Sequence, residues 1–331
     1  MITASAPPLQ TIRDDVTEAA GVHLRLLRLD LIHPLLQGNK WYKLRLNLEE
    51  AARQRSSGGP EKGQEKVTLL SFGGAWSNHL RALAAAGALH GFRTIGVVRG
   101  ELPHPLNPVL AFARQQGMIL HPVERSSYRQ KHSEAFLAGL RQQFGDFFLI
   151  PEGGANVEGA LGCKDIVAHL QWSVAPARRH LLLACGTGTT LAGILHGIHH
   201  DPPADCRVTG VAVVKGIGIN GESFLQADVR QMLQRLEEGD PLVLPLLPPP
   251  LIPPPQRCDW HIEAHWHCGG YARTTPELLA SIASFQARHD VPLEPVYTGK
   301  MIHGLYRRLR EGGVERGSEI IAIHTGGIHP R

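Results

Sequence analysis

Short apolar runs alternate with longer amphipathic segments along most of the chain. Runs rich in Leu, Ile and Val, typical of buried strands, occupy residues 22–31, 67–72, 94–98, 119–121, 147–150, 180–185, 207–215, 260–267 and 319–324. Segments with helical character lie between them, at 39–53, 80–89, 107–117, 133–144, 156–172, 189–199, from 275 onward, and 300–310. Strands that alternate with helices predict an α/β protein whose mostly parallel sheet is covered on both faces.

Proline marks helix starts and one large interruption. Asn107-Pro108 and Thr275-Pro276 each combine a capping side chain with proline at the first helical position. The segment 241–255 carries eight prolines in fifteen residues, which excludes a helix interior or a central strand. We expect an exposed insertion there.

The composition indicates an ordinary globular protein. Of 331 residues, 43% are hydrophobic and 19% charged, and the net charge of +4 comes from scattered lysines and arginines, so we expect no nucleic-acid partner. Residues 1–10 lack a basic region followed by an apolar core, and no run reaches the roughly 18 apolar residues of a membrane helix. Five cysteines without a CxxC pair predict free thiols. A cytoplasmic protein without a membrane partner is expected.

Lys40 follows a helix-opening Gly38-Asn39 pair, and Lys43 lies on the same helix face. Lysines on an amphipathic helix are commonly solvated, and this stretch alone favours that interpretation. The functional alternative is an amine desolvated in a pocket, where its pKa falls and it can form a Schiff base with a carbonyl.

A glycine- and threonine-rich turn follows the apolar run at 180–185 and opens a helix. It comprises Gly186, Thr187, Gly188, Thr189 and Thr190. Backbone N–H groups and the helix dipole at such a turn form an anion site. The Gly-Lys-Ser/Thr ending of a nucleotide P-loop is missing, so the turn suits one small phosphate group.

Two further patterns carry alternative chemistry. The segment 216–221 matches the dinucleotide fingerprint GxGxxG, with Glu237 near the expected acidic position, and would suit a nicotinamide-dependent oxidoreductase. His261, His265 and His267 would share one face of a strand and, with Cys268, could bind zinc. With nineteen histidines in the chain, such a cluster is expected by chance, and we predict no metal.

A lysine for a Schiff base, a separate site for one phosphate, and Ser77-Asn78 at a helix start form a consistent set. Together they indicate pyridoxal phosphate, whose aldehyde, phosphate and ring each need a partner.

From about residue 28 to 327 the chain resembles the D-cysteine desulfhydrase and 1-aminocyclopropane-1-carboxylate deaminase family of fold type II pyridoxal-phosphate enzymes. The resemblance is carried by 38–40, the substrate-loop sequence 71–78, the phosphate loop 186–190, Tyr271 in Gly-Gly-Tyr, Tyr297 in Pro-Val-Tyr-Thr-Gly-Lys, and 324–327. It implies two mostly parallel sheets, a larger domain formed by 1–66 and 149–331, a smaller inserted domain at 67–148, and a homodimer.

The resemblance also implies roles for individual residues. Lys40 would bind the cofactor aldehyde and Lys43 would lie near the phosphate. Ser77, Asn78, His79 and Tyr271 would contact the substrate, with Asn78 also beside the ring oxygen. Ser77, Tyr271 and Tyr297 would join Lys40 in catalysis.

Thr298 and Thr325 place the chain with one branch of that family. Deaminases carry glutamate and leucine at these positions, whereas desulfhydrases carry small hydroxyl residues. The sequence therefore predicts β-elimination from D-cysteine or a similar β-substituted amino acid. The alternatives are a 1-aminocyclopropane-1-carboxylate deaminase, a racemase, a catalytically inactive cofactor-binding protein and the oxidoreductase.

Overall fold

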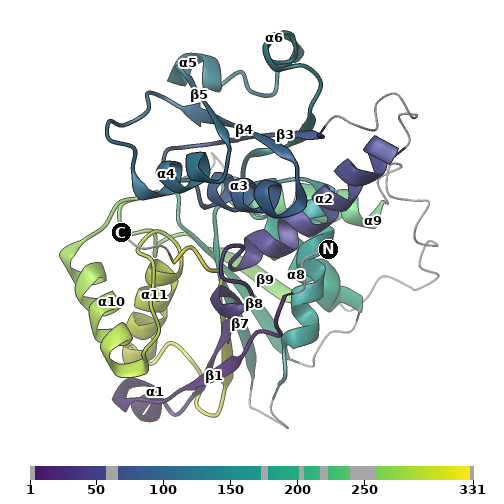
Figure 1. The fold of residues 1–331 in the computed structure, drawn as a ribbon. Helices are drawn as coiled ribbons and strands as arrows, with labels where there is room; N and C mark the ends of the chain where they lie inside the picture. Colours follow the sequence, from purple (N-terminus) through teal and green to yellow (C-terminus); the bar gives the residue numbers. More distant parts are fainter. Residues whose placement is uncertain are drawn as a thin grey trace.

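The computed structural model describes residues 4–56, 66–172, 178–200, 205–216, 223–238 and 258–328. The larger of its two sheets has six strands (Figure 1). Their spatial order is β1 (Leu9–Ile12), β2 (His23–Arg28), β10 (Glu319–His324), β7 (Arg179–Cys185), β8 (Cys206–Ala212) and β9 (Asp259–Glu263). Only β1 runs antiparallel to its neighbour within this sheet.

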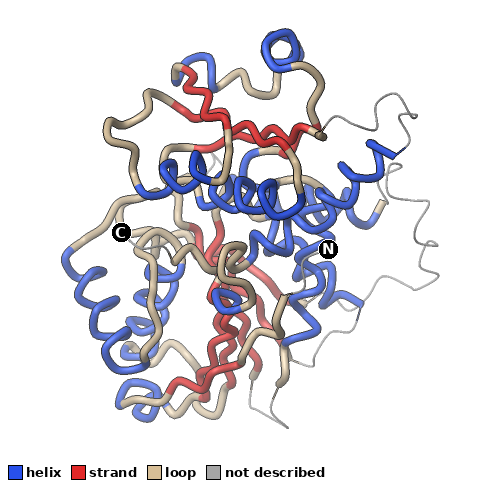
Figure 2. The backbone as a smooth tube through the Cα atoms, viewed as in Figure 1, coloured by secondary structure: helices blue, strands red, loops and turns tan. Residues whose placement is uncertain are grey.

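The smaller sheet has four parallel strands. Their order is β5 (Ile119–Val123), β4 (Arg93–Arg99), β3 (Thr68–Gly73) and β6 (Phe148–Ile150). In Figure 2 the two sheets stand apart, with helices between them. These features confirm the predicted α/β class. The division into two domains at about residues 67 and 148 stays a prediction, and the insertion expected at 241–255 lies outside the described residues.

The central strands of the larger sheet are continuously apolar because both faces are covered. Leu181 and Leu183 pack with α7 (Val157–Lys164), α8 (Thr189–His200) and α9 (Phe224–Glu237). Leu182 and Ala184 face the opposite way, toward α10 (Pro276–His289), α11 (Thr298–Arg310) and the short α1 (Asp15–Ala20). This alternation is expected of a parallel sheet between two helix layers.

The smaller sheet is covered in the same way. Helices α3 (Asn78–His90) and α4 (Pro108–Gln115) cover one face, and α5 (Arg125–Tyr128) with α6 (Glu134–Phe144) covers the other. The long α2 (Asn39–Ser56) lies between the two sheets (Figure 1). Its Trp41 packs against the cores of both, so α2 positions the first-turn lysines where the two layers meet.

The structure confirms the two predicted proline-marked helix starts. The Asn107 side chain accepts a hydrogen bond from the Leu110 amide, and Thr275 caps α10 in the same manner. Among the described helices, none is long and apolar enough to cross a membrane.

Several predicted boundaries are wrong by a few residues, and two differ most from the structure. The helix expected to reach residue 172 ends at Lys164, because a 3-10 turn (Asp165–His169) follows and buries Ile166. The strand expected to reach residue 267 ends at Glu263. There the Glu263 carboxylate accepts the His265 amide and turns the chain, so that Trp266 packs against Gly304 of α11.

Candidate functional site

A cavity of about 440 Å³ lies where the loops of both sheets meet the start of α2. Its walls come from turns that follow β3, β6, β7 and β10, which is where ligands bind in open α/β sheets. Most of the residues singled out from the sequence line it: Lys40, Lys43, Ser77, Asn78, His79, Gly186, Thr187, Gly188, Thr190, Tyr271, Tyr297 and Thr325. Two other candidates, Thr189 and Thr298, are buried behind the wall.

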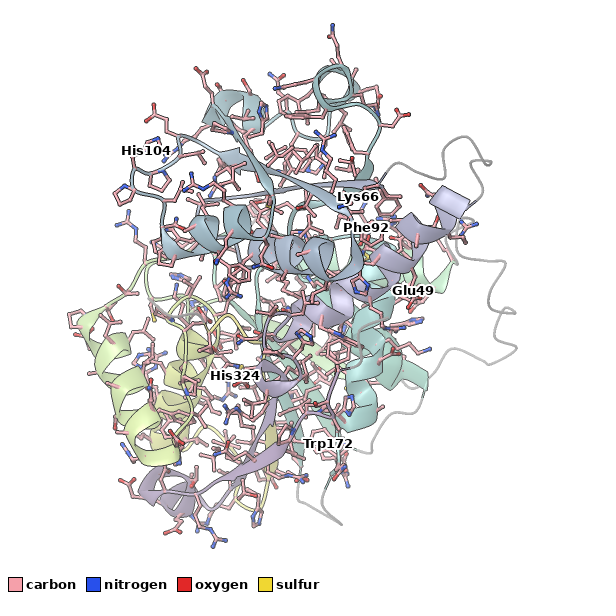
Figure 3. The ribbon with its side chains drawn as sticks, in the orientation of Figure 1. Glu49, Lys66, Phe92, His104, Trp172 and His324 are labelled. Carbon is pink, nitrogen blue, oxygen red and sulfur yellow. The ribbon has the colours of Figure 1, made fainter. Side chains whose placement is uncertain are left out.

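The segment after β10 closes against the start of α2. Gly38 has a φ of +68°, and a Cβ there would lie 1.9 Å from the Thr325 carbonyl oxygen, so only glycine fits. The Asn39 amide donates to the same oxygen at 3.3 Å. His324, labelled in Figure 3, is fully buried and accepts the Gly326 amide at 3.2 Å. These contacts fix the 324–327 turn beside the lysines.

The two lysine amines converge on one carbonyl. Lys40 Nζ donates to the Gly153 oxygen at 3.3 Å and Lys43 Nζ to the same oxygen at 3.1 Å. Neither amine forms an ion pair with a carboxylate in the described part of the chain. Burial lowers the pKa of Lys40 well below its ordinary value, with a further contribution from the charge of Lys43, and burial also lowers the pKa of Lys43. An incoming anion or aldehyde would complete this arrangement.

The turn between β7 and α8 faces the lysines. Gly188 has a φ of +72°, and Thr187 Oγ1 lies 3.4 Å from Lys43 Nζ and 3.0 Å from Thr189 Oγ1. Asn39 Nδ2 donates to Thr190 Oγ1 at 2.9 Å, which ties the start of α2 to the start of α8. Backbone amides at this helix start, together with a buried ammonium group, match the requirements of a phosphate.

The turn between β3 and α3 forms the opposite wall. Ser77 caps α3, since its Oγ accepts the Leu80 amide at 3.2 Å. Asn78 lies against the 324–327 turn, called the closing turn below: a Cβ on Gly327 would be 2.5 Å from Asn78 Nδ2. His79 is almost fully buried, and its Nε2 lies 2.9 Å from Ser71 Oγ.

Two tyrosines complete the cavity. The rings of Tyr271 and Tyr297 lie edge to face with centroids 6.2 Å apart, and Tyr271 is exposed at the mouth. Burial raises the pKa of Tyr297 well above its ordinary value, with Tyr271 adding to the effect. Its phenol therefore stays protonated and can donate a hydrogen bond.

A model of the family described as "Pyridoxal-phosphate dependent enzyme" matches residues 13–326. The chain belongs to this family. Its cofactor is pyridoxal phosphate, and the cavity fits that group because it combines a low-pKa lysine amine with a separate anion-binding helix start.

Relatives in the pyridoxal-phosphate family span nearly the whole chain. A putative 1-aminocyclopropane-1-carboxylate deaminase of Pyrococcus horikoshii is 28% identical over 97% of this chain and 89% of its own length. A bifunctional mitochondrial D-cysteine desulfhydrase/1-aminocyclopropane-1-carboxylate deaminase of Arabidopsis thaliana is 26% identical over 93% and 73%, respectively. The crystal structure of an ACC deaminase homologue superposes with a TM-score of 0.78 at 25% identity, covering 99% of this chain and 91% of that one. The predicted fold type and enzyme class are confirmed.

Thr298 occupies a different environment from Thr325. Its hydroxyl donates to Glu294 Oε1 at 3.2 Å, and the Glu294 carboxylate also accepts the amides of Val296, Tyr297 and Thr298. Burial raises the pKa of Glu294 even though these hydrogen bonds oppose the shift. Sequence reasoning missed Glu294, although an acidic residue just before a helix start is a recognisable capping signal.

Residues that do line the cavity were also missed, among them Gly153, Glu152 and Arg81. The Gly153 carbonyl receives both lysines, and the pair of glycines after β6 was the available signal. Glu152 lines the cavity 3.4 Å from Lys131. Arg81, on α3, is buried with its guanidinium 3.8 Å from the Phe112 ring centre. No sequence pattern identifies Arg81 as a wall residue.

The described residues of the two alternative patterns, Gly216 and the cluster His261, His265, His267 and Cys268, do not line the cavity. Residues 217–221 of the GxGxxG match lie outside the described residues, and Gly216 packs against Phe224. His265 and His267 follow the end of β9, so they do not share a strand face with His261. The geometric argument for that zinc cluster, including Cys268, is therefore wrong.

Proposed function

We propose that this protein catalyses β-elimination from a small β-substituted amino acid, with D-cysteine as the first candidate, giving pyruvate, ammonia and sulfide. The observation that carries the proposal is the convergence in one cavity of the Lys40 amine, the start of α8 and the start of α3. These supply a nucleophilic amine, a phosphate site and a carboxylate site, respectively.

Lys40 would serve first as the attachment point and then as a base. Because burial lowers its pKa, a larger fraction of its amine is neutral and can react with the cofactor aldehyde. When bound, pyridoxal phosphate supplies an electron sink for the carbon next to the substrate amine. Once the substrate has displaced Lys40, the freed Lys40 amine can take the α-proton of the substrate.

The phosphate would bind at the start of α8. The amides of the turn, including those of Gly186, Gly188 and Thr189, would donate to it, together with the hydroxyls of Thr187 and Thr190 and the ammonium of Lys43. The observed contact between Lys43 and Thr187 supports this assignment.

The substrate carboxylate would bind at Ser77 and Asn78, at the start of α3, where the helix dipole favours an anion, with His79 behind them. When the C–S bond breaks, its electron pair leaves with sulfur as hydrosulfide, and the protonated Tyr297 hydroxyl can position the departing sulfur by donating a hydrogen bond to it. Tyr271, at the mouth, would position the departing group. Water then hydrolyses the released enamine to pyruvate and ammonia.

Thr298 and Thr325 favour β-elimination over opening of a cyclopropane ring. A carboxylate next to the pyridine nitrogen would favour its protonation and strengthen the electron sink. Thr325 supplies a neutral hydroxyl to the cavity wall, and the Thr298 hydroxyl is already donated to Glu294. The second candidate is a 1-aminocyclopropane-1-carboxylate deaminase, which the name of the Pyrococcus horikoshii relative favours.

The test is a side-by-side assay of ammonia release from D-cysteine, L-cysteine, D-serine and 1-aminocyclopropane-1-carboxylate, with pyruvate and sulfide measured for the cysteines, pyruvate for D-serine and 2-oxobutanoate for the cyclopropane substrate. We expect the highest kcat/KM with D-cysteine. A clear preference for the cyclopropane substrate would refute the argument from the two threonines. Turnover of none of the four, with the cofactor bound, would favour a binding protein without catalysis.

We further propose a cytoplasmic homodimer. The five cysteines are all free, which suits a reducing compartment. Cell fractionation and light scattering on the purified protein would test the compartment and the subunit number.

A further inference from the structure

His79 carries an unsatisfied nitrogen in the wall of the cavity. The side chain is 2% exposed, and its Nδ1 atom is buried with no hydrogen-bond partner. Buried polar atoms in native proteins nearly always have partners. An orphaned nitrogen beside a ligand cavity is therefore available for a hydrogen bond when the cavity is occupied.

The hydrogen bonds on the other side of the ring select its tautomer. Ser71 is fully buried, and its Oγ lies 2.9 Å from His79 Nε2 and 3.4 Å from the Pro151 carbonyl oxygen. A hydroxyl has one proton, and the Pro151 oxygen can only accept it. Ser71 then accepts a hydrogen bond from Nε2–H, which leaves a lone pair on Nδ1.

The surrounding charges keep the imidazole neutral. A Cβ on Gly154 would lie 3.3 Å from Lys43 Cβ and 3.5 Å from His79 Cε1, so the Lys43 stem and the His79 ring both pack against Gly154. The neighbouring Gly153 carbonyl oxygen accepts the hydrogen bond from Lys40 Nζ. Burial, and then the charges of Lys40 and Lys43, lower the pKa of His79 well below its ordinary value. Glu152 from the same turn also lines the cavity but is paired with Lys131, and Arg81 is the remaining cation on α3.

We propose that His79 is a positioning residue for Lys40, with its neutral ring fixed by Ser71 so that the Nδ1 lone pair accepts a hydrogen bond from the freed Lys40 amine. Gly153 and His79 together then provide two acceptors for an amine that has just taken a proton. The inference rests on the proposed function for Lys40 as the base. The substrate contact predicted for His79 would then not involve the carboxylate, since a ring lone pair would repel an anion.

Two substitutions at one position separate this role from packing. His79→Asn can place an oxygen acceptor near the position of Nδ1, whereas His79→Gln keeps an N–H near Nε2 and removes the Nδ1 acceptor. With D-cysteine we expect His79→Gln to lower kcat about tenfold with little change in KM, because one charged hydrogen bond is lost. The acid limb of its kcat profile should move about one unit to lower pH, since Lys40 becomes a weaker base.

The Asn variant should keep a near-native kcat and pH profile. Equal losses in the two variants, or a loss confined to the Asn variant, would overturn the proposal. His90→Gln, at the far end of the same helix, serves as the control for substitution of a histidine in α3.

A readout independent of turnover is the ¹⁵N spectrum of His79 in the holoenzyme. We expect the Nε2–H tautomer from pH 6 to 8, and a shift of the Nδ1 resonance when D-alanine, which has no β leaving group, displaces Lys40. That shift should vanish in Lys40→Ala and persist in Lys43→Met. An Nδ1–H tautomer, an imidazolium at pH 6, or a shift retained in Lys40→Ala would overturn the inference, whether or not the protein eliminates sulfide.

Discussion

Two glycine-containing turns open helices on opposite walls of the cavity, and they differ in what faces them. The start of α8 faces the buried ammonium of Lys43, which contacts Thr187. The start of α3 is capped by its own Ser77 and touches the closing turn through Asn78. Both helix starts can bind an anion, but the first also has a lysine amine in contact with the turn itself, whereas Arg81 of α3 lies against the Phe112 ring.

This difference explains how one fold can hold two anions in defined places. A phosphate of charge near −2 is best stabilised where a buried lysine joins the helix amides, whereas a carboxylate of charge −1 needs only amides and neutral side chains. In the proposed function, the surrounding elements, and not the glycine turns themselves, would therefore assign cofactor and substrate to their walls.

The largest effect is expected at the α8 wall. Lys43→Met should weaken cofactor binding about 10- to 150-fold, since it removes one charged hydrogen bond of about 1.5–3 kcal/mol. The affinity can be measured by titrating the apoprotein with cofactor and following absorbance. Lys164→Met, at the end of α7 outside the cavity, is the matched control. An unchanged affinity in Lys43→Met would place the phosphate elsewhere.

Gly188 is a poorer probe of the same wall. A Cβ there would lie 2.6 Å from Val229 Cγ2 on α9, and the residue has a positive φ. A bulky residue at position 188 is therefore expected to reduce stability as well as cofactor affinity, which makes the lysine variant the cleaner test.

A smaller effect is expected at the α3 wall. Ser77→Ala should raise KM for D-cysteine about tenfold, through loss of one hydrogen bond to a charged carboxylate, and lower stability by about 1 kcal/mol through loss of the cap. Ser133→Ala removes an equivalent cap at α6, where Oγ accepts the Phe136 amide at 3.3 Å. The control should show the same stability loss with an unchanged KM; a KM change in both variants would contradict a direct role for Ser77.

The smallest effect is expected in the pH dependence of the unfolding free energy. It arises from His79, the buried histidine of the α3 wall. His79 has a depressed pKa in the folded state, so the unfolded chain binds the extra proton, and the stability from this group is lost as pH falls below about 6.5. Replacing it in His79→Asn should flatten the dependence of unfolding free energy on pH by at most about 1.4 kcal/mol per unit between pH 5 and 6.5. Denaturant unfolding at several pH values measures this slope, and an unchanged slope would mean that His79 titrates normally.

Much of this architecture is readable in the sequence because the strongest signals are local. The apolar run Ile320–Ile323 can be satisfied only by burial on both faces, and Asn107-Pro108 fixes a helix start without tertiary contacts. By contrast, β1 and α1 are short and gain their stability from neighbours distant in the chain, so their patterns are weak. The ends of α7 and β9 depend on how Ile166 and Trp266 enter the core, which local spacing cannot express.

The candidate site also has features that the sequence predicts and features that it does not. The motif residues around Lys40, Ser77 and Gly186 were identified by their turns and by a family resemblance, and the structure brings them to one cavity. What the sequence could not supply is orientation: the Thr298 hydroxyl points to Glu294 rather than lining the cavity. The orientation of the Thr298 hydroxyl depends on the buried Glu294 carboxylate, which also accepts the Thr298 amide once the first turn of α11 has folded.

The central claim is that Lys40 holds the cofactor, and chemical reduction tests it most directly. Borohydride reduction of the yellow holoenzyme, followed by proteolysis and peptide mass mapping, should place the pyridoxyl label on Lys40. Lys43, three residues away and also buried, is the internal control because it shares the cavity and the Gly153 carbonyl. A label on Lys43 or Lys300, or on no lysine, would contradict the account.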